Sequence, residues 1–257
     1  MSLAGRSGDL PETFFSGNFR YPMDKSASIT RPELSAPALP GGRLVLMPFS
    51  PVSDLLLRVN RNAWHKTKVQ PGKLLYLNRT AVLLAGPGAP LSVMALEKVR
   101  NLGLKEILVL SYCGSLNENF KTGMALVATG ALSQEGTSAH YARSRHGFYT
   151  PDKEMLHMIK STLERLHLPF ASGFIVSTDA PYRETAAWLK KLQRKKIVAV
   201  DMEMSAVLAF ARFYRLKAAG LFIVTDELSA RKWEDGSPSQ AVKSTTENYF
   251  YPLIFSE

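Results

Sequence analysis

Acidic residues follow two apolar, β-type runs of the chain, where their side chains could do chemistry. Asp201 and Glu203 come after the run 197–200, and Asp226 comes after the run 221–224. Open α/β sheets bind ligands at the carboxyl ends of their strands. A buried carboxylate at such a place needs partners, and paired hydroxyl groups are suitable because an ionised carboxylate accepts from both. Asp226 could act as a general acid if burial keeps it protonated.

The same acids have structural interpretations that the sequence leaves open. Asp201 and Glu203 could simply favour the N-terminus of the next helix, and Asp226 could cap the turn that follows it. A third junction, Leu84-Ala85-Gly86-Pro87-Gly88, would let a ligand approach the backbone and helix amides. It could equally be an ordinary strand-to-helix turn.

The elements that must position these residues alternate between strand and helix from Arg43 onward. The expected strands are Leu44 to Pro48, Leu74 to Ala85, Ile107 to Tyr112, Ala125 to Thr129, Phe174 to Ser177, Ile197 to Val200 and Leu221 to Val224. The expected helices are Val52 to Trp64, Leu91 to Leu102, Lys153 to Leu166, Glu184 to Lys195, Met204 to Arg215 and one from Ser239 towards the C-terminus. This alternation predicts a sheet with helices on both faces.

Length and composition indicate one soluble domain. The 257 residues, 46% of them hydrophobic, can bury one core. We expect residues 1–42 to form an irregular arm outside the core, because they are rich in proline, glycine and serine, and residues 43–257 to form the domain. The chain shows neither a membrane-spanning run nor a secretory signal, so we expect a cytoplasmic protein without a membrane partner. The single cysteine, Cys113, excludes a disulfide framework and a structural zinc site.

The net charge of +10 could attract nucleic acid or small phosphorylated ligands. Basic residues cluster at 190–196, at the end of an expected helix, where cations complement the helix dipole and face solvent. Neither zinc-finger spacing nor an aromatic RNA-binding signature accompanies them. We therefore expect no nucleic-acid partner.

Taken in order, six segments resemble the nucleoside phosphorylase family, which includes purine nucleoside phosphorylase, uridine phosphorylase and methylthioadenosine nucleosidase. The resemblance extends from about Arg43 to Leu228. The segments are Gly86-Pro87, Gly114 with Gly123, Glu135-Gly136-Thr137-Ser138-Ala139-His140-Tyr141, Ser177-Thr178-Asp179-Ala180-Pro181-Tyr182, Asp201-Met202-Glu203 and Thr225-Asp226. The Met-Glu pair and the ordered series are specific, whereas each isolated segment is not.

The resemblance implies a single-domain three-layer α/β/α fold with a mixed central sheet, and an enzyme that cleaves the bond between sugar and base. It assigns Glu203 and Met202 to the ribose and Tyr182, Thr178 and Val200 to the base, and it implies that Asp226 protonates or hydrogen-bonds a purine ring nitrogen. It implies neither a metal nor another cofactor, with phosphate as the co-substrate, and a homo-oligomer, commonly a dimer or a trimer of dimers.

The phosphate-binding residues of the family are missing here. Phosphorolytic relatives use a Pro-Gly-Asp-Pro-x-Arg loop and an arginine on a later strand, but this chain reads Pro48-Phe49-Ser50-Pro51-Val52-Ser53 and Val109-Leu110-Ser111-Tyr112-Cys113-Gly114. Serine and valine replace neither the charge nor the bidentate geometry of arginine. The remaining candidates for an anion site are Gly86, Ser111, Tyr112 and Lys66, the last reaching a neighbouring subunit.

Three functions remain open at this point. Phosphorolysis is the family default, hydrolysis needs no phosphate site, and a nucleoside-binding protein would have lost catalysis. A purine is favoured because Asp226 matches the acid of purine-cleaving members. The stretch from Tyr182 to Asp201 is also too short for the Gln-x-Arg insertion by which uridine phosphorylases read uracil.

Overall fold

The computed structural model describes residues 29–30, 32–49, 53–144, 146–228 and 232–255. Within them, eleven strands form one mixed sheet in the order β11-β10-β6-β8-β9-β5-β1-β4-β3-β2, with β7 added beside β6. The strands are β1 Arg43–Met47, β2 His65–Val69, β3 Gly72–Tyr76, β4 Ala81–Leu84, β5 Glu106–Ser115, β6 Ala125–Gln134, β7 Phe148–Tyr149, β8 Ala171–Thr178, β9 Ile197–Asp201, β10 Lys217–Glu227 and β11 Glu234–Asp235.

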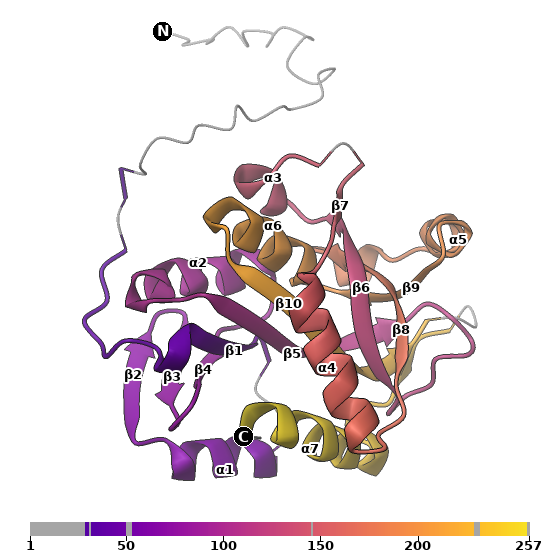
Figure 1. The fold of residues 1–257 in the computed structure, drawn as a ribbon. Coiled ribbons are helices and arrows are strands. Elements are labelled where there is room, and N and C mark those ends of the chain that lie inside the picture. The colour runs from indigo at the N-terminus through magenta and orange to yellow at the C-terminus, as the bar shows by residue number, and fades with distance from the viewer. Residues whose placement is uncertain (1–28, 31, 50–52, 145, 229–231, 256–257) are drawn as a thin grey trace, which may run out of the picture.

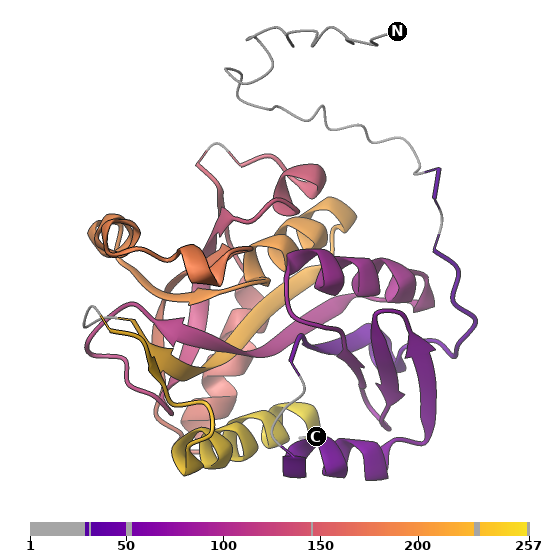
Figure 2. The same cartoon turned by 180° about the vertical axis from the view of Figure 1, so that it is seen from behind.

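Helices cover both faces of this sheet, as the sequence predicts (Figures 1 and 2). They are α1 Ser53–Asn62, α2 Ala89–Val99, α3 Ser138–Tyr141, α4 Lys153–Arg165, α5 Ala186–Arg194, α6 Met204–Tyr214 and α7 Gln240–Phe255. Apolar residues of α2 and α6 share one buried core with the sheet, and those of α1, α4 and α7 share the core on the other face. The expected fold class is therefore confirmed.

Part of the sheet closes on itself. Strand β10 pairs in parallel with β5 and antiparallel with β6, while β6, β8, β9 and β5 pair in succession. These five strands form a ring, and β1, β4, β3 and β2 extend from it. Closure brings the carboxyl ends of β5, β9 and β10 together, although β9 and β10 are separated by a whole helix in the chain.

One predicted strand is wrong. Residues Leu74 to Ala85 contribute to two antiparallel strands, β3 and β4. The chain reverses between them in a turn in which the Leu77 amide donates to the Thr80 carbonyl at 2.8 Å. Strand β2 was not expected, and its polar, half-exposed residues explain why its sequence carries no clear strand pattern. The predicted helices are present with shifted ends, except that Val52 lies outside the described residues.

The described part of the arm is irregular and ends in a short 3-10 turn, Pro40–Gly42. The expectation that it stays outside the core is wrong at Leu39, which is buried and donates its amide to the carbonyl of Leu102 at 2.8 Å. Residues 1–28 and 31 lie outside the described part. Among the described helices, none combines the length and the apolar character needed to cross a membrane.

Candidate functional site

The junction between β9 and α6 is held by Asp201, which is 5% exposed. One carboxylate oxygen accepts the backbone amides of Glu203 and Met204, at 3.0 and 2.7 Å. The other accepts the Ser177 hydroxyl at 2.5 Å. Asp201 therefore satisfies amides at the start of α6, which is the structural interpretation that the sequence left open.

Glu203 is completely buried beside it. Its Oε1 accepts the backbone amide of Gly88 at 2.5 Å, and its Oε2 has no hydrogen-bond partner among the described residues. Burial, and then the negative charge of Asp201, raise the pKa of Glu203 to about 8. Burial likewise raises the pKa of Asp201 to about 6. A buried carboxyl oxygen without a partner is costly, so a donor from outside the described residues would stabilise it.

Gly114, at the end of β5, lets the side chain of Asp226 pack against the β5 backbone. Gly114 lies in register with both Val200 of β9 and Asp226 of β10. A Cβ atom at Gly114 would stand 2.9 Å from the Asp226 carboxylate and 2.8 Å from the Leu228 side chain. Only glycine fits there without a shift of these neighbours. The pKa of the adjacent Cys113 thiol is raised by its burial and by the charges of Asp201 and Asp226, so the two acidic junctions share one neighbourhood.

Asp226 is half-buried and holds two donors. The Thr225 hydroxyl donates to Oδ1 at 2.8 Å, and the Trp233 indole N–H donates to Oδ2 at 3.1 Å. Burial, followed by the charge of Asp226, raises the pKa of Glu184 to about 7. Sequence reasoning missed both Trp233 and Glu184, because Trp233 belongs to no regular motif and Glu184 was interpreted only as the start of a helix.

The residues assigned to the base and the sugar differ in how far they are buried. Thr178 and Val200 are buried, with the Thr178 hydroxyl accepting the amide of Ala180 at 3.2 Å. Met202 is half-buried. Tyr182 is 99% exposed in the 3-10 turn Pro181–Arg183, so its contact with a base stays a prediction.

The residues expected at an anion site do not come together within this chain. Ser111 is buried on the α2 and α6 side, where its hydroxyl has no partner in the described part, and Gly86 lies in the turn before α2. Tyr112 points to the opposite face, against the ring of Phe250, because successive strand residues alternate. Lys66 is exposed on β2, the far edge strand. Within one chain the structure does not bring these four residues together, and the anion site stays a prediction.

Asp201, Glu203 and Asp226 form no ion pair within the part of the chain that the structure describes. The ion pairs of the described residues involve Glu97, Glu106, Glu154, Glu227 and Glu234 instead. The described residues also contain no acidic, histidine or cysteine group arranged to hold a metal ion. Among the described residues, the site therefore offers hydrogen-bond acceptors and no ion-pairing cation.

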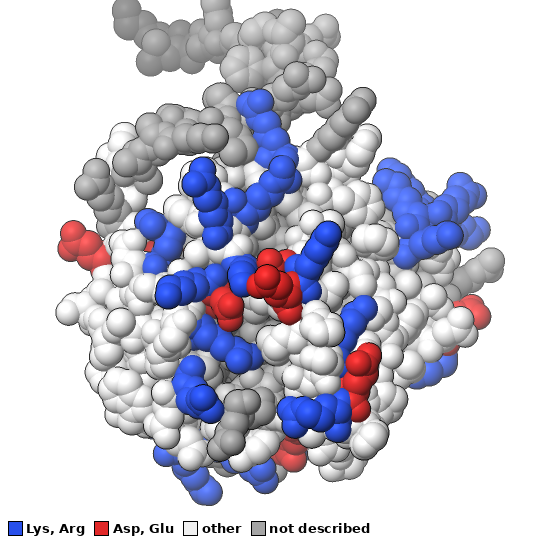
Figure 3. Space-filling view, in the orientation of Figure 1, with Lys and Arg blue, Asp and Glu red and all other residues white. Residues whose placement is uncertain are grey.

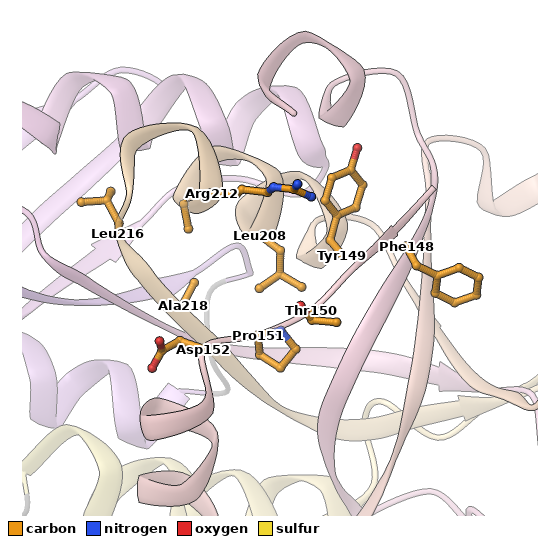
Figure 4. A pocket seen from close by; sticks show the side chains of 10 residues that line it. Phe148, Tyr149, Thr150, Pro151, Asp152, Leu208, Arg212, Leu216 and Ala218 are labelled. Atoms are coloured by element: carbon orange, nitrogen blue, oxygen red, sulfur yellow. The ribbon is translucent and has the colours of Figure 1, made fainter. Parts of the chain in front are cut away.

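A separate cavity of about 250 Å³ lies at the other end of β10. Ala218, near the start of that strand, lines it together with Leu208, Arg212, Pro151 and other residues of α6 and the β7–α4 connection (Figure 4). Asp152, at its edge, caps α4 by accepting two backbone amides. Asp226 lies eight residues further along β10, so this cavity is not the site formed by the acids.

Basic side chains are spread over the face seen in Figure 3 and gather most densely where α5 lies. Lys190, Lys191 and Arg194 are exposed on that helix. This agrees with the expected solvated basic helix end. The absence of a nucleic-acid partner stays a prediction.

Comparison with known proteins places these features in a family context. The model of the phosphorylase superfamily matches residues 60–249. The chain is similar to guanosine phosphorylase of Halorubrum lacusprofundi, with 31% identity over 145 residues, 56% of this chain and 60% of the relative. It is also similar to the DeoD-type purine nucleoside phosphorylase of Brevibacillus brevis, with 28% identity over 151 residues, 58% of this chain and 64% of the relative. These matches span less than two thirds of each relative's length.

Solved structures show the same fold. Purine nucleoside phosphorylase of Toxoplasma gondii, in complex with immucillin-H, superposes with a TM-score of 0.67 at 19% identity, covering 82% of this chain and 87% of that one. Futalosine hydrolase of Helicobacter pylori gives a TM-score of 0.66 at 15% identity, covering 82% and 94%. At these identities the likeness concerns the fold alone.

Proposed function

The chain belongs to the phosphorylase superfamily, and from that premise we propose that it cleaves the N-glycosidic bond of a nucleoside, with purine nucleosides as the favoured substrates. The observation that carries this proposal is the Glu203 carboxyl group. It is completely buried, one oxygen is fixed by the Gly88 amide, and the other has no partner in the described chain. The 2′- and 3′-hydroxyl groups of a ribose are donors of the kind that this oxygen needs.

The remaining residues take roles around the sugar. Met202 packs against the ribose, Thr178, Val200 and Tyr182 line the base, and Asp226 protonates or hydrogen-bonds a purine ring nitrogen. As the glycosidic bond breaks, its electron pair goes to the base nitrogen and positive charge develops on the sugar. A carboxylate at the sugar and a proton donor at the base both stabilise that transition state.

Phosphorolysis is the first candidate for the second half of the reaction, because the relatives named above include a guanosine and a purine nucleoside phosphorylase. In this reaction a phosphate oxygen bonds to C1′ of the sugar. Lys66 would then act from a neighbouring copy in a homo-oligomer, a dimer or a trimer of dimers, because within one chain it lies on the far edge strand. The proposal names no other cofactor.

Hydrolysis is the second candidate, and one specific observation favours it. The acids of the site have no cationic partner among the described ion pairs, and Ser111 and Tyr112 face opposite sides of the sheet. Such a site binds a phosphate dianion poorly. With water as the nucleophile, a water oxygen bonds to C1′ and a proton is released.

A panel of purine and pyrimidine nucleosides, assayed for base release with and without phosphate, tests both candidates. Release that requires phosphate supports phosphorolysis, and equal release without phosphate supports hydrolysis. Nucleoside binding without release from any member of the panel would leave only a binding protein.

A further inference from the structure

We propose that Ser177 is a positioning residue for this reaction: together with Asp201 it fixes the first turn of α6, so that the Glu203 carboxyl group is free to bind the sugar. The inference rests on the proposed function. Ser177 lies at the end of β8 and is completely buried. It is one of the motif residues to which neither the resemblance nor the proposed function gives a role.

The Ser177 hydroxyl links three elements. It donates to the Asp201 carboxylate at the end of β9, at 2.5 Å, and it accepts the backbone amide of Ser205 in α6, at 2.9 Å. A hydroxyl group has one donor, and here that donor is given to a charged acceptor. Such charge-assisted hydrogen bonds are stronger than neutral ones. Ser177 therefore determines both where Asp201 points and where α6 begins.

A second connection supports the same turn. The Ser205 hydroxyl donates to Oε1 of Glu135 at 2.9 Å, and the Ser133 hydroxyl donates to the same oxygen at 2.7 Å. The other oxygen of Glu135 accepts the amides of Thr137 and Ser138, at 2.6 and 3.0 Å. The start of α6 is thus tied to β6 as well as to β8 and β9.

This arrangement explains why Glu203 is available. Glu203 occupies the N-cap position of α6, but its side chain makes no capping hydrogen bond. Asp201, two residues earlier, accepts the amides of Glu203 and Met204 instead. The Glu203 side chain therefore reaches the Gly88 amide, and its Oε2 has no hydrogen-bond partner among the described residues. Without the Ser177 donor, Asp201 would lose the contact that orients it, and Glu203 would lose its fixed backbone.

The test compares Ser177→Ala with Ser115→Ala, a matched control. Ser115 is also a completely buried strand serine, and its hydroxyl donates to the Asn117 carbonyl at 2.8 Å. Each protein is assayed with its best purine ribonucleoside and with the 2′,3′-dideoxy analogue, across pH. We expect Ser177→Ala to lower kcat/KM for the ribonucleoside by roughly tenfold, as for a lost hydrogen bond to a charged group, and to affect the dideoxy analogue much less. Ser115→Ala should not change the ratio of kcat/KM for the ribonucleoside to kcat/KM for the dideoxy analogue.

The pH profile of kcat/KM separates a positioning role of Ser177 from a merely structural one, because loss of stability alone would not shift it. The Ser177 hydroxyl lowers the pKa of Asp201, which burial raises to about 6. Its removal raises that pKa further, so the acid limb of the profile should move to higher pH. Ser177→Cys, which keeps a weak donor of similar size, should give an intermediate shift and covers the case in which the alanine variant does not fold.

Two results would overturn the inference. The first is a Ser177→Ala or Ser177→Cys protein with lowered thermal stability but an unchanged ribose preference and an unchanged acid limb. The second is a wild-type protein that does not bind either nucleoside by calorimetry, which would overturn the proposed function as well. If the wild type binds nucleosides without releasing base, only the proposed function is overturned. The role of Ser177 is then tested by the ratio of the dissociation constants for the ribonucleoside and the dideoxy analogue, compared between the wild type and the variants.

Discussion

Two strand ends in this protein carry acids of the same kind in different settings. At the end of β9, Asp201 and Glu203 are buried and held by backbone amides and a serine hydroxyl. At the end of β10, Asp226 is half-buried and holds a threonine hydroxyl and an exposed indole. Its neighbour Glu227 pairs with Lys121 at 3.0 Å, and the Thr122 amide first, then Lys121, lower the pKa of Glu227.

The difference fits the separate roles proposed for the two ends, at the sugar for β9 and at the base for β10. The carboxyl groups of Asp201 and Glu203 accept main-chain amides, which fits the proposed role of this end at the constant part of a nucleoside, its sugar. Asp226 is held by two side chains instead, which fits its proposed role at the base.

Asp226→Asn should have the largest effect on turnover. The substitution keeps the size of the side chain and one acceptor but removes the transferable proton. We expect purine nucleoside cleavage to fall by roughly 10²- to 10⁴-fold, as is typical for loss of a general acid, while binding changes less. Steady-state kinetics with the best purine nucleoside measure this. An unchanged rate would show that Asp226 only caps the following turn, where asparagine serves equally well, and would reopen the choice of a pyrimidine.

Gly114→Ala should disturb the same end of the site without removing a functional group. Its Cβ would stand within 3 Å of both Asp226 and Leu228, so these side chains must move. A displacement of about 1 Å can cost roughly 100-fold in rate, and we expect a loss of up to that size in kcat/KM. Gly136→Ala is the control, because its Cβ would meet its nearest neighbour at 3.7 Å. Equal activity of the two variants would contradict the close packing at Gly114.

The buried carboxyl group of Glu203 should make the free energy of unfolding depend on pH. Folding raises the pKa of Glu203 from about 4.5 to about 8, so between these pH values the folded state binds a proton that the unfolded state does not. The free energy of unfolding therefore falls as pH rises through this window, by the order of a few kcal/mol. Glu203→Gln should remove most of that slope and make the ligand-free protein more stable at pH 8. Urea unfolding at several pH values tests this, and an identical slope in the variant would contradict the burial of an unpaired carboxyl group.

Trp233→Phe should have the smallest effect. The indole donates to Asp226 but is 62% exposed, and an exposed hydrogen bond competes with water. We expect at most about a threefold change in kcat/KM, corresponding to less than about 1 kcal/mol. A much larger loss would mean that the indole closes over the base.

Local sequence patterns predict the fold class well because buried strands and amphipathic helices have strong periodicities. The same patterns do not locate a turn inside an apolar stretch or a half-exposed strand at the edge of the sheet. The turn at Leu77 to Thr80 divides one apolar stretch into two strands, and the half-exposed strand β2 has little apolar character. The closure of β10 onto β5 joins distant segments, and a local pattern does not encode it.

The candidate site follows the same division. The sequence locates the acids, because they interrupt apolar strands, and it leaves both roles of Asp201 open until the structure shows its capping contacts. Alternation along β5 separates Ser111 from Tyr112, although they are neighbours in sequence. The hydroxyl network of Ser177, Ser205 and Glu135 depends on three elements meeting, so single-segment reasoning could not find it.

We infer that Oε2 of Glu203, which has no hydrogen-bond partner among the described residues, binds the sugar hydroxyl groups, and one comparison of substrates tests this role. The ratio of kcat/KM for the best purine ribonucleoside to that for its 2′,3′-dideoxy analogue is measured in the wild type and in Glu203→Ala. Above pH 8, where the Glu203 carboxyl group is ionised, loss of a hydrogen bond to it costs about 1.5 to 3 kcal/mol, so the wild type should prefer the ribonucleoside by roughly 10- to 150-fold. The variant should lose most of that preference while it remains folded. A variant that keeps the wild-type preference would contradict the account.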